Sequence, residues 1–480
     1  MSPQAGHGSR AGSIHLGVSV HFFIVNLGCP KNSVDGEGMA ALLQAAGHRP
    51  ARSQRRADLV IVNTCGFIAA ARAESLAALR EAARDKRPGQ VLIAAGCLAE
   101  RQGADLARRV PGIDACIGTR HWSQIVTLVD RLLAAAGSAP VLLQSTGPGD
   151  PVARCERTAS GPTAYLKIAD GCDAACAFCA IPAIKGPQRS KPREAVLAEA
   201  RALVDRGVRE LILIAQDTTA YGRDLGDRDG LATLIRDLLR EVPELVWLRL
   251  MYAYPQHIDD RLIDLLASDS RICHYLDLPL QHAHPDVLRR MRRPHDVEQV
   301  VRLVERLRAA MPDIALRTTF IVGFPGETEL EFEALLRFIE VMRFDRVGIF
   351  TYSKERGTPA AALPGQLPPT IRRERYERAM ALQQTVSLEC NRALIGRTLL
   401  VLTEGSENGI TAGRSYRDAP EVDGLVLVRG AYPLGEFLPV TVTEALEYDL
   451  VGAPAGEPWQ RAQRLSGVHR EDPPVDGAGG

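Results

Sequence analysis

Three closely spaced cysteines constrain this chain more than any other feature of its sequence. Cys172, Cys176 and Cys179 stand in GCDAACAFC, a CxxxCxxC spacing that follows the apolar run TAYLKIA. Three thiolates on one tight loop can hold three irons of a 4Fe-4S cube and leave the fourth iron open to a small chelating molecule. The alternatives are a zinc knuckle or three unrelated buried thiols, although zinc sites usually need a fourth nearby Cys or His. The loop therefore predicts an iron-sulfur cluster at the end of a strand.

Three further cysteines share one local context although they lie far apart in the sequence. Cys29, Cys65 and Cys97 each follow an apolar run, in HFFIVNLGC, ADLVIVNTC and VLIAAGC. Unbroken Val, Ile and Leu runs that alternate with amphipathic stretches are typical of parallel strands joined by helices. Because ligands bind beyond the carboxyl ends of such strands, these thiols predict a second metal or cluster site. The alternative is three small buried residues that fill strand ends.

The order of these patterns predicts an α/β protein with three domains. An N-terminal parallel α/β sheet domain is expected over residues 21–136, and a Gly, Pro and Ser-rich linker over about 137–163. Six strand-like runs then alternate with helical ones over residues 158–390, which predicts a partial (β/α)6 barrel with its chemistry at the strand carboxyl ends.

The last part of the chain has a different pattern. Short strand-like segments over residues 391–452, divided by Gly and Asn, predict a small antiparallel β-barrel. Residues 1–20 and 453–480 have little apolar patterning and are expected to be disordered. Residues 1–20 also contain neither a signal peptide pattern nor a membrane span.

Charge and cysteine content limit the class of protein. Lys plus Arg and Asp plus Glu both number 58, so no overall positive field indicates a nucleic-acid partner, while a local basic patch stays open. Ten cysteines in 480 residues are too sparse for a disulfide scaffold, and six of them form two sets that require reduced thiols. We therefore expect a cytoplasmic protein that does not bind a membrane.

The order of the parts resembles the radical-SAM methylthiotransferases, whose terminal module is called TRAM, and the resemblance covers roughly residues 21–452. It implies a sulfur-transferring enzyme with two 4Fe-4S clusters and S-adenosyl-L-methionine (SAM). One cluster would be bound by Cys172, Cys176 and Cys179, and the other by the three N-terminal cysteines.

The resemblance also implies a mechanism that uses SAM twice. Reduction of the barrel cluster would cleave one SAM to a 5'-deoxyadenosyl radical, which removes hydrogen from a carbon, and a second SAM would methylate a sulfur at the N-terminal cluster. An electron donor and a sulfur source are required. By position at strand ends, Gln216 and Asp217 are candidates for contacts with the methionyl or ribose part of SAM, and Gly323 and Gly326 for backbone approach to its adenine or ribose.

Members of this family differ in substrate. One branch modifies an adenosine beside the tRNA anticodon, and another modifies the β-carbon of an aspartate in ribosomal small-subunit protein twelve. The motifs GCPKN and RSYRDAPEVDG look like the ribosomal-protein branch, since the tRNA branch usually reads GCQMN. Residues 391–452 carry five basic and nine acidic residues, which suits a basic protein better than RNA phosphates. We therefore expect the ribosomal protein as partner and no direct nucleic-acid binding.

Two other functions stay open at this point. One is a tRNA (N6-isopentenyl-adenosine) C2 methylthiotransferase, and the other is a noncatalytic iron-sulfur carrier or scaffold. The carrier hypothesis predicts no SAM cleavage, whereas either enzyme must release 5'-deoxyadenosine under reducing conditions.

Overall fold

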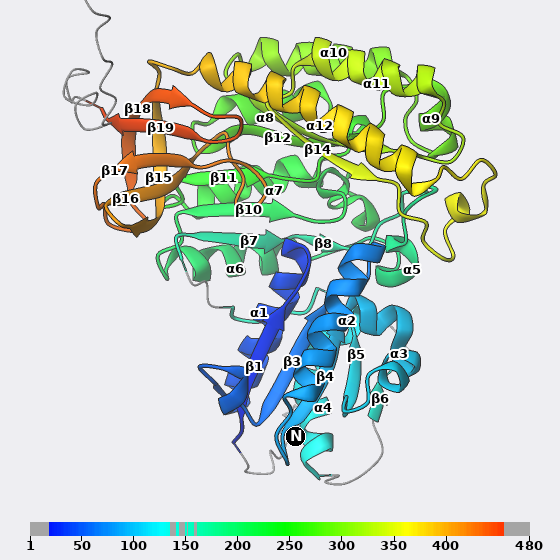
Figure 1. The fold of residues 1–480 in the computed structure, drawn as a ribbon. Coiled ribbons are helices and arrows are strands. Elements are labelled where there is room, and N and C mark those ends of the chain that lie inside the picture. Colours follow the sequence, from blue (N-terminus) through cyan, green and yellow to red (C-terminus); the bar gives the residue numbers. More distant parts are fainter. Residues whose placement is uncertain (1–18, 135–140, 144–148, 151, 158–160, 456–480) are drawn as a thin grey trace, which may run out of the picture.

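The computed structural model describes residues 19–134, 141–143, 149–150, 152–157 and 161–455. Figure 1 shows three parts: a sheet domain coloured blue to cyan, a larger green-to-yellow barrel above it, and a small orange-red β-barrel at the side of the larger one. This is the α/β architecture that the sequence predicts, with both parallel regions and the terminal β-barrel present. The terminal segments expected to be disordered lie mostly outside the described residues.

The N-terminal domain is a parallel six-stranded sheet in the order β2-β1-β3-β4-β5-β6. Its central strand β3 is buried along its whole length, which explains the unbroken apolar run in the sequence. Helices on both sides of the sheet enclose two separate apolar cores. The strands are β1 (His21–Asn26), β2 (Arg49–Pro50), β3 (Leu59–Thr64), β4 (Val91–Gly96), β5 (Ala115–Gly118) and β6 (Val141–Leu143), and the helices are α1 (Pro30–Ala45), α2 (Ala69–Arg84), α3 (Cys97–Arg109) and α4 (Ile125–Ala134).

Strand β6 differs from the expectation of a linker over residues 137–163. Its three residues pair in parallel with β5, so the N-terminal sheet continues past residue 136. A strand of three residues is too short to show periodicity in a Gly and Pro-rich segment, and the pairing that forms it comes from a distant strand.

The larger barrel contains six parallel strands in the order β14-β13-β12-β11-β10-β7. Because β7 and β14 are the two ends of this sheet, the barrel is partial. Leucine-rich helices cover its outer face and form the largest apolar core. The strands are β7 (Thr163–Lys167), β10 (Glu210–Ile214), β11 (Trp247–Leu250), β12 (Ile272–Gln281), β13 (Ala315–Val322) and β14 (Arg346–Thr351), and the covering helices are α6 (Arg193–Val204), α7 (Gly230–Glu241), α8 (Asp260–Ser268), α10 (Val297–Ala310) and α11 (Glu329–Met342).

Side-chain caps fix where several of these helices begin. The side chain of Asp259 accepts a hydrogen bond from the Leu262 N–H at the start of α8. Helix α11 begins with a capping box in which Thr328 and Glu331 each satisfy the other's backbone N–H. Such caps satisfy orphan donors of the first turn and set the length of the loop before each helix.

Helix α12 (Pro369–Arg392) leads from the larger barrel into the small one. The small barrel is closed, in the order β15-β16-β17-β19-β18. The run PVTVTEALEYDLVG belongs to two of its strands, because the chain turns where the Leu446 N–H donates to the Asp449 carbonyl. Its strands are β15 (Thr398–Glu407), β16 (Ile410–Ser415), β17 (Val426–Arg429), β18 (Phe437–Ala445) and β19 (Leu450–Pro454).

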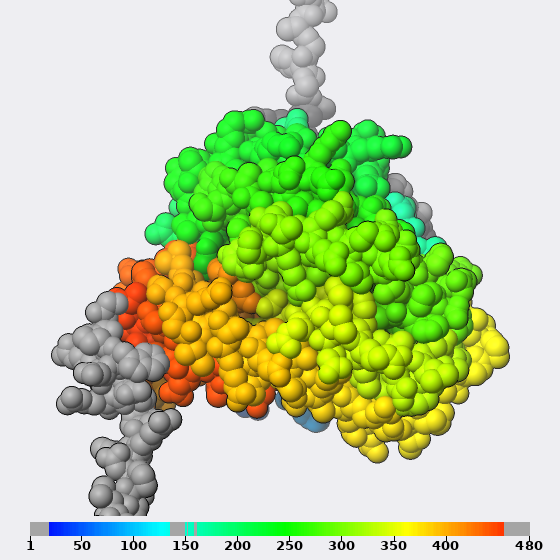
Figure 2. Space-filling model, turned by 90° about the horizontal axis from the view of Figure 1, so that it is seen from above, coloured from blue at the N-terminus to red at the C-terminus, as the bar shows by residue number. Residues whose placement is uncertain are grey.

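The small barrel packs against the inner face of the larger sheet. Trp247 and Met251 from β11 and its loop share an apolar cluster with Leu402 and Ala419 of the small barrel. The ring of Phe437 meets Trp247 edge-on, with the ring centroids 4.7 Å apart. Seen from above in Figure 2, the small barrel lies beside the yellow-orange α12, and the two barrels cover nearly all of the N-terminal domain.

A buried ion network joins the two barrels at this interface. The Glu210 carboxylate accepts hydrogen bonds from Arg249 Nε at 2.7 Å and from Arg414 Nη2 at 2.6 Å. All three side chains are at most 1% exposed. Burial alone would raise the pKa of Glu210, but the two guanidinium groups outweigh it and lower that pKa to about 2.

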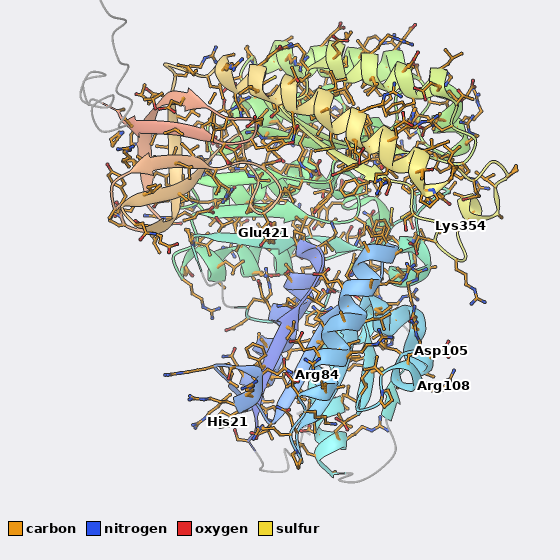
Figure 3. All side chains as sticks on the ribbon, in the orientation of Figure 1. His21, Arg84, Asp105, Arg108, Lys354 and Glu421 are labelled. Carbon is orange, nitrogen blue, oxygen red and sulfur yellow. The ribbon has the colours of Figure 1, made fainter. Side chains whose placement is uncertain are left out.

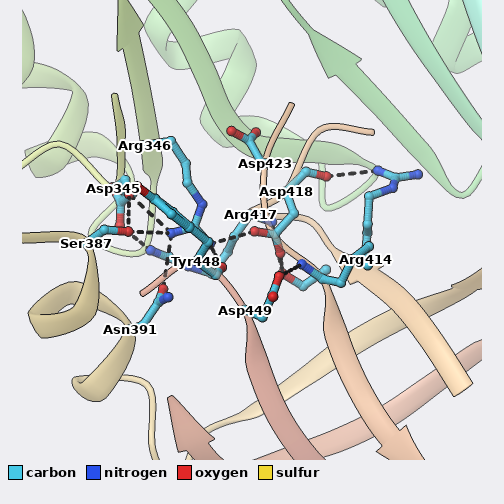
Figure 4. Close-up of polar contacts among 12 residues, drawn as sticks. Asp345, Arg346, Ser387, Asn391, Arg414, Arg417, Asp418, Asp423, Tyr448 and Asp449 are labelled. Atoms are coloured by element: carbon cyan, nitrogen blue, oxygen red, sulfur yellow. Dashed lines mark hydrogen bonds and ion pairs between the residues drawn. The ribbon is translucent and has the colours of Figure 1, made fainter. Parts of the chain in front are cut away.

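The motif RSYRDAPEVDG supplies more of these contacts (Figure 4). Asp418 lies 2.8 Å from Arg346 Nη2, and Arg417 pairs with Asp345. Asp423 accepts a hydrogen bond from the Tyr275 hydroxyl at 2.7 Å. The motif therefore holds the domains together, and two of its acidic residues are committed to that role.

This arrangement reduces the charge difference that the sequence suggests for residues 391–452. Arg414, Arg417, Asp418 and Asp423 are buried in pairs within the protein. The exposed charges are three arginines and five glutamates: Arg392, Arg397, Arg429, Glu407, Glu421, Glu436, Glu444 and Glu447. Among them, Glu421 lies near the junction of the three domains (Figure 3). The surface remains acidic, but less so than the residue count suggests.

We predict that Glu210→Gln destabilises the protein by roughly 3 kcal/mol at pH 7, because it leaves two buried guanidinium groups without their carboxylate. The measurement is a urea titration followed by tryptophan fluorescence, since Trp247 lies at the interface. The exposed Glu407→Gln is the control. Since folding lowers the pKa of Glu210 from 4.5 to about 2, the difference from wild type should be full above pH 4.5 and shrink as the pH falls toward 2. An equal effect of both substitutions would contradict the prediction.

Candidate functional site

Three cysteines meet at the carboxyl edge of the N-terminal sheet. Cys29 is the N-cap residue of α1, Cys65 follows β3, and Cys97 is the first residue of α3 after β4. Strands β1, β3 and β4 are direct neighbours, so their carboxyl ends lie side by side. The pKa of the Cys97 thiol is raised to about 12, mainly by burial; the Lys185 ammonium group opposes this rise, and the neighbouring Cys29 and Cys65 add to it. The structure thus brings together the three thiols that the sequence singled out.

Glycines leave space for this close approach. Gly28 has a φ of +91°, and a Cβ added there would lie 2.6 Å from Cβ and 2.9 Å from Sγ of Cys65. A Cβ on Gly66 would lie 2.8 Å from the carbonyl carbon of Cys97. The sequence around each cysteine is therefore constrained by backbone packing as well as by the thiol.

The second cysteine set lies on the loop between β8 (Ala169–Asp170) and α5 (Ile181–Lys185). Backbone N–H groups of Ala174 and Ile181 donate to the sulfurs of Cys172 and Cys179, both at 3.4 Å. Arg293 Nη1 donates to Cys176 Sγ at 3.8 Å. Burial raises the pKa of Cys172 to about 11 and that of Cys179 to about 12. Metal binding to these sulfurs would therefore release protons.

Both cysteine sets fit a cluster better than a single metal ion. In the part of the chain that the structure describes, the one group of three His, Cys, Asp or Glu ligand atoms within 4.8 Å of one another is His284, Asp286 and Glu331. A tetrahedral zinc ion would hold its sulfurs about 3.8 Å apart. Neither cysteine set appears among such groups, so the three thiols of each set are spaced more widely than a zinc ion requires. This wider spacing, with N–H groups that donate to the sulfurs of Cys172 and Cys179, matches an iron-sulfur cluster.

The two cysteine sets adjoin one another. Cys97 packs in a small buried cluster with Ala180 and Ile184, and Ala180 directly follows Cys179. Arg120, two residues after β5, donates to the carbonyl oxygens of Ala183 and Ile184, both at 2.9 Å. The N-terminal domain is therefore fixed against the loop that carries the second set.

A buried group of charges lies beside both sets. Lys185 Nζ donates to Asp170 at 2.9 Å and to the Thr119 hydroxyl at 3.0 Å, and Lys167 pairs with Asp35 and Asp170. Burial alone would raise the pKa of Asp170, but the two ammonium groups lower it well below its usual range. In the sequence, Lys185 stands where an arginine is expected in relatives, which left a carboxylate-binding role for it in doubt; the structure shows that Lys185 binds Asp170 and Asp35 of its own chain.

The predicted SAM contacts after β10 lie near the barrel cysteines. Burial accounts for most of the raised pKa of Cys172, and the Asp217 carboxylate raises it further, which places Asp217 close to that thiol. Asp217 Oδ1 accepts a hydrogen bond from the Thr219 hydroxyl at 2.6 Å. Gln216 is half-buried, and its side chain makes no hydrogen bond to any described residue. Their contact with SAM stays a prediction.

The two candidate glycines after β13 lie against other parts of the chain. Gly323 has a φ of +73°, and a Cβ there would lie 2.2 Å from Cγ of Arg372 on α12. Gly326 has a φ of +75°, and its N–H donates to the Gly365 carbonyl at 2.8 Å. Both positions need glycine for backbone reasons, and a role in binding the adenine or ribose stays a prediction.

His284, Asp286 and Glu331 have structural roles. His284 Nδ1 accepts a hydrogen bond from the Asp286 N–H at the start of α9 (Pro285–Arg290), and Glu331 pairs with Arg290 and completes a helix cap. Burial lowers the pKa of the neighbouring His282 to about 3, so this imidazole is neutral. We therefore do not assign a metal site to His284, Asp286 and Glu331.

Sequence reasoning missed Lys31 and Tyr252. Lys31 follows Cys29 by two residues and is 5% exposed, and its Nζ lies 3.2 Å from the centre of the Tyr252 ring. Tyr252 has a φ of +61°, a rare conformation for an aromatic residue. The motif GCPKN drew attention to the cysteine, and nothing in it shows that its lysine is buried.

Each of the three parts of the fold contains a match to a known family. Residues 166–339 match the radical SAM superfamily, residues 395–454 match the TRAM domain, and residues 21–118 match the uncharacterized protein family UPF0004. Within the described residues, no helix is long and apolar enough to cross a membrane.

Curated relatives resemble the chain over most of its length. A protein named ribosomal protein uS12 methylthiotransferase RimO from Chloroflexus aurantiacus is 53% identical over 450 residues, which cover 90% of this chain and 99% of the relative. Proteins of the same name from Roseiflexus castenholzii and Herpetosiphon aurantiacus are 53% and 48% identical, and each alignment covers 90% of this chain and 96% or more of the relative. The chain belongs to the RimO family of radical-SAM methylthiotransferases.

Solved structures confirm the fold at low sequence identity. The radical S-adenosylmethionine methyltransferase TsrM from Kitasatospora setae, with cobalamin and a [4Fe-4S] cluster bound, superimposes with a TM-score of 0.54. The match covers 84% of this chain and 82% of that protein at 15% identity. This similarity concerns the fold alone.

We predict that Gly28→Ala destabilises the protein more than Gly47→Ala. Both glycines have a φ near +90°, but a Cβ on Gly47 meets nothing within 4 Å. Gly47→Ala should cost about 1 kcal/mol of strain, whereas Gly28→Ala should cost about 1–3 kcal/mol more because Cys65 must move. Urea unfolding followed by circular dichroism measures both, and equal losses would show that Cys65 is not tightly held.

Proposed function

We propose that this chain transfers a methylthio group to the β-carbon of an aspartate in ribosomal protein uS12. The observation that carries the proposal is the meeting of two three-cysteine sets at one domain interface, in a chain that shares about half its residues with proteins named for that activity. A carrier or scaffold has no need for two adjoining sites fixed by buried charges.

We assign one 4Fe-4S cluster to Cys172, Cys176 and Cys179 and the other to Cys29, Cys65 and Cys97. When bound, the clusters supply the one-electron reduction of SAM and the site of the transferred sulfur. The protein holds these sites in fixed relation and excludes water between them, because Cys97, Ala180 and Ile184 are buried together. Three protein sulfurs for each cluster leave one iron open for SAM or for the sulfur.

Other residues are proposed to orient SAM and to shape the barrel site. Arg293 donates to Cys176 and stacks on the Tyr254 ring, with its guanidinium carbon 4.2 Å from the ring centre. Asp217 lies near Cys172 and Gln216 has a free amide, so both suit the polar groups of SAM. Gly323 and Gly326 complete this assignment at the end of β13.

The proposed partners follow from the reaction. An electron donor must reduce the barrel cluster, and a sulfur source must supply the transferred atom. Ribosomal protein uS12 is the substrate in the names of the relatives, and the acidic surface of the small barrel suits a basic protein better than RNA. We propose that the reaction occurs in the cytoplasm, where thiols stay reduced.

We predict different losses from the two cysteine sets. Cys176→Ala should abolish SAM cleavage, whereas Cys65→Ala should keep SAM cleavage and lose methylthiolation. Each variant should hold about four irons per chain after anaerobic reconstitution, compared with about eight in wild type. Cys390→Ala, which changes a half-buried thiol on α12, is the control and should keep full iron and activity. Normal SAM cleavage by Cys176→Ala would contradict the assignment of the barrel site.

We predict that ribosomal protein uS12 gains about 46 Da when incubated with the reconstituted enzyme, SAM, sulfide and a reductant, because a methylthio group replaces hydrogen. Intact-protein mass spectrometry measures the gain, and fragmentation locates it on one aspartate. A parallel reaction with anticodon-stem tRNA is the control. A gain on the tRNA alone would keep the chemistry and overturn the proposed substrate.

A further inference from the structure

Lys31 carries a buried amine that has no carboxylate partner among the described residues. It lies in the first turn of α1 and is 5% exposed, yet it makes no hydrogen bond or ion pair to any described residue. Every other buried lysine in the described part of the chain pairs with a carboxylate: Lys167 and Lys185 with Asp35 and Asp170, and Lys191 with Glu199. Lys31 therefore differs from lysines that hold the fold together.

Three ionisable groups of opposite charge lie near Lys31, and each has another role: the Cys29 thiol is assigned to the N-terminal cluster, and the two carboxylates already have partners. Asp277 accepts hydrogen bonds from Arg317 Nη1 at 2.8 Å and from the Tyr252 N–H at 3.2 Å. Asp170 pairs with Lys167 and Lys185. Burial of an ammonium group without a carboxylate is costly, and contact with an aromatic ring offsets only part of that cost. The site thus retains the capacity to bind one carboxylate.

The Tyr252 ring holds the amine in position. Lys31 Nζ lies 3.2 Å from the centre of the Tyr252 ring. Tyr252 follows β11 and has a φ of +61°. A strained backbone of this kind persists where the surrounding contacts fix it, and here the Asp277 carboxylate binds the Tyr252 N–H. Lys31 therefore presents its ammonium group between Cys29 and the carboxyl ends of the barrel strands.

We propose that Lys31 binds the side-chain carboxylate of the substrate aspartate and so selects an acidic side chain for methylthiolation. This inference rests on the proposed function. The β-carbon of aspartate is bonded directly to its carboxyl carbon, so a charge-assisted hydrogen bond to the carboxylate also fixes the carbon that reacts. Lys31 is a substrate-binding residue in this account, and the cysteines keep their cluster role.

The test compares Lys31→Met with wild type on two substrates, uS12 and its counterpart in which the target aspartate is replaced by asparagine. Methionine keeps the length of the side chain and removes the charge. We expect kcat/KM on uS12 to fall roughly 30-fold or more, as for the loss of one partner of a buried charge pair. Wild type should prefer aspartate to asparagine by a similar factor, and Lys31→Met should lose that preference.

A second readout does not depend on turnover. Fluorescence anisotropy with labelled uS12 and reconstituted enzyme, without reductant, should show the same loss of aspartate preference in binding. Lys86→Met is the matched control, because Lys86 pairs with Asp114 at the opposite edge of the N-terminal sheet. It should leave affinity, activity and iron content unchanged.

Three results would overturn the inference, and they are distinguishable. An unchanged preference for aspartate in Lys31→Met shows that another group binds the carboxylate. An equal loss on both substrates together with a loss of about four irons assigns Lys31 to the N-terminal cluster. Wild-type enzyme that cleaves SAM but modifies neither form of uS12 refutes the proposed function itself.

Discussion

The buried charges around Asp35 and Lys185 are the interaction on which the rest of the site depends. Asp35 lies six residues after Cys29 on α1, and Lys185 lies six residues after Cys179. Their side chains meet at 3.4 Å, and Lys167, Asp170 and Thr119 complete the group. Each member is at most 4% exposed. Since the loss of one partner in such a buried pair costs about 3–5 kcal/mol, the group fixes two distant segments of the chain against each other.

The same principle operates at the other domain interface. Glu210 from the larger barrel holds Arg249 of its own sheet and Arg414 of the small barrel. The small barrel thus covers the inner face of the larger sheet, and it is held there by charged pairs and an apolar cluster. The carboxyl ends of the strands carry the cysteine loop and Tyr252. Structural and chemical roles are separated along the strands, as in other parallel β/α barrels.

Much of the fold was predictable because its signals are local. Unbroken apolar runs predict the parallel strands, and the spacing of Cys172, Cys176 and Cys179 predicts one cluster site without knowledge of the rest of the chain. The ion pairs of Asp418 and Asp423 could not be predicted in this way. The sequence counts them among the acidic residues that suit a basic protein, whereas their partners Arg346 and Arg317 lie on distant strands that no local pattern connects to them.

The positions of the cysteines in the site were predictable from the sequence, but the contacts around them were not. Each N-terminal cysteine follows a strand, so its place at the sheet edge follows from the pattern, but the burial of Lys31 depends on how Tyr252 from another domain packs over it. Gly323 and Gly326 were expected near SAM because glycine allows close approach, and the structure adds that Arg372 and Gly365 of the same chain lie against them. Contacts with a bound molecule depend on that molecule as much as on the sequence.

The central claim is that the two cysteine sets of one chain form a single reaction centre. The most direct measurement mixes equal amounts of Cys65→Ala and Cys176→Ala enzyme, each of which keeps one intact set, and scores methylthiolated uS12 by mass spectrometry. A single centre within each chain predicts no product from the mixture, although SAM is still cleaved. Recovery of product would show that sulfur passes between chains, and it would contradict the account.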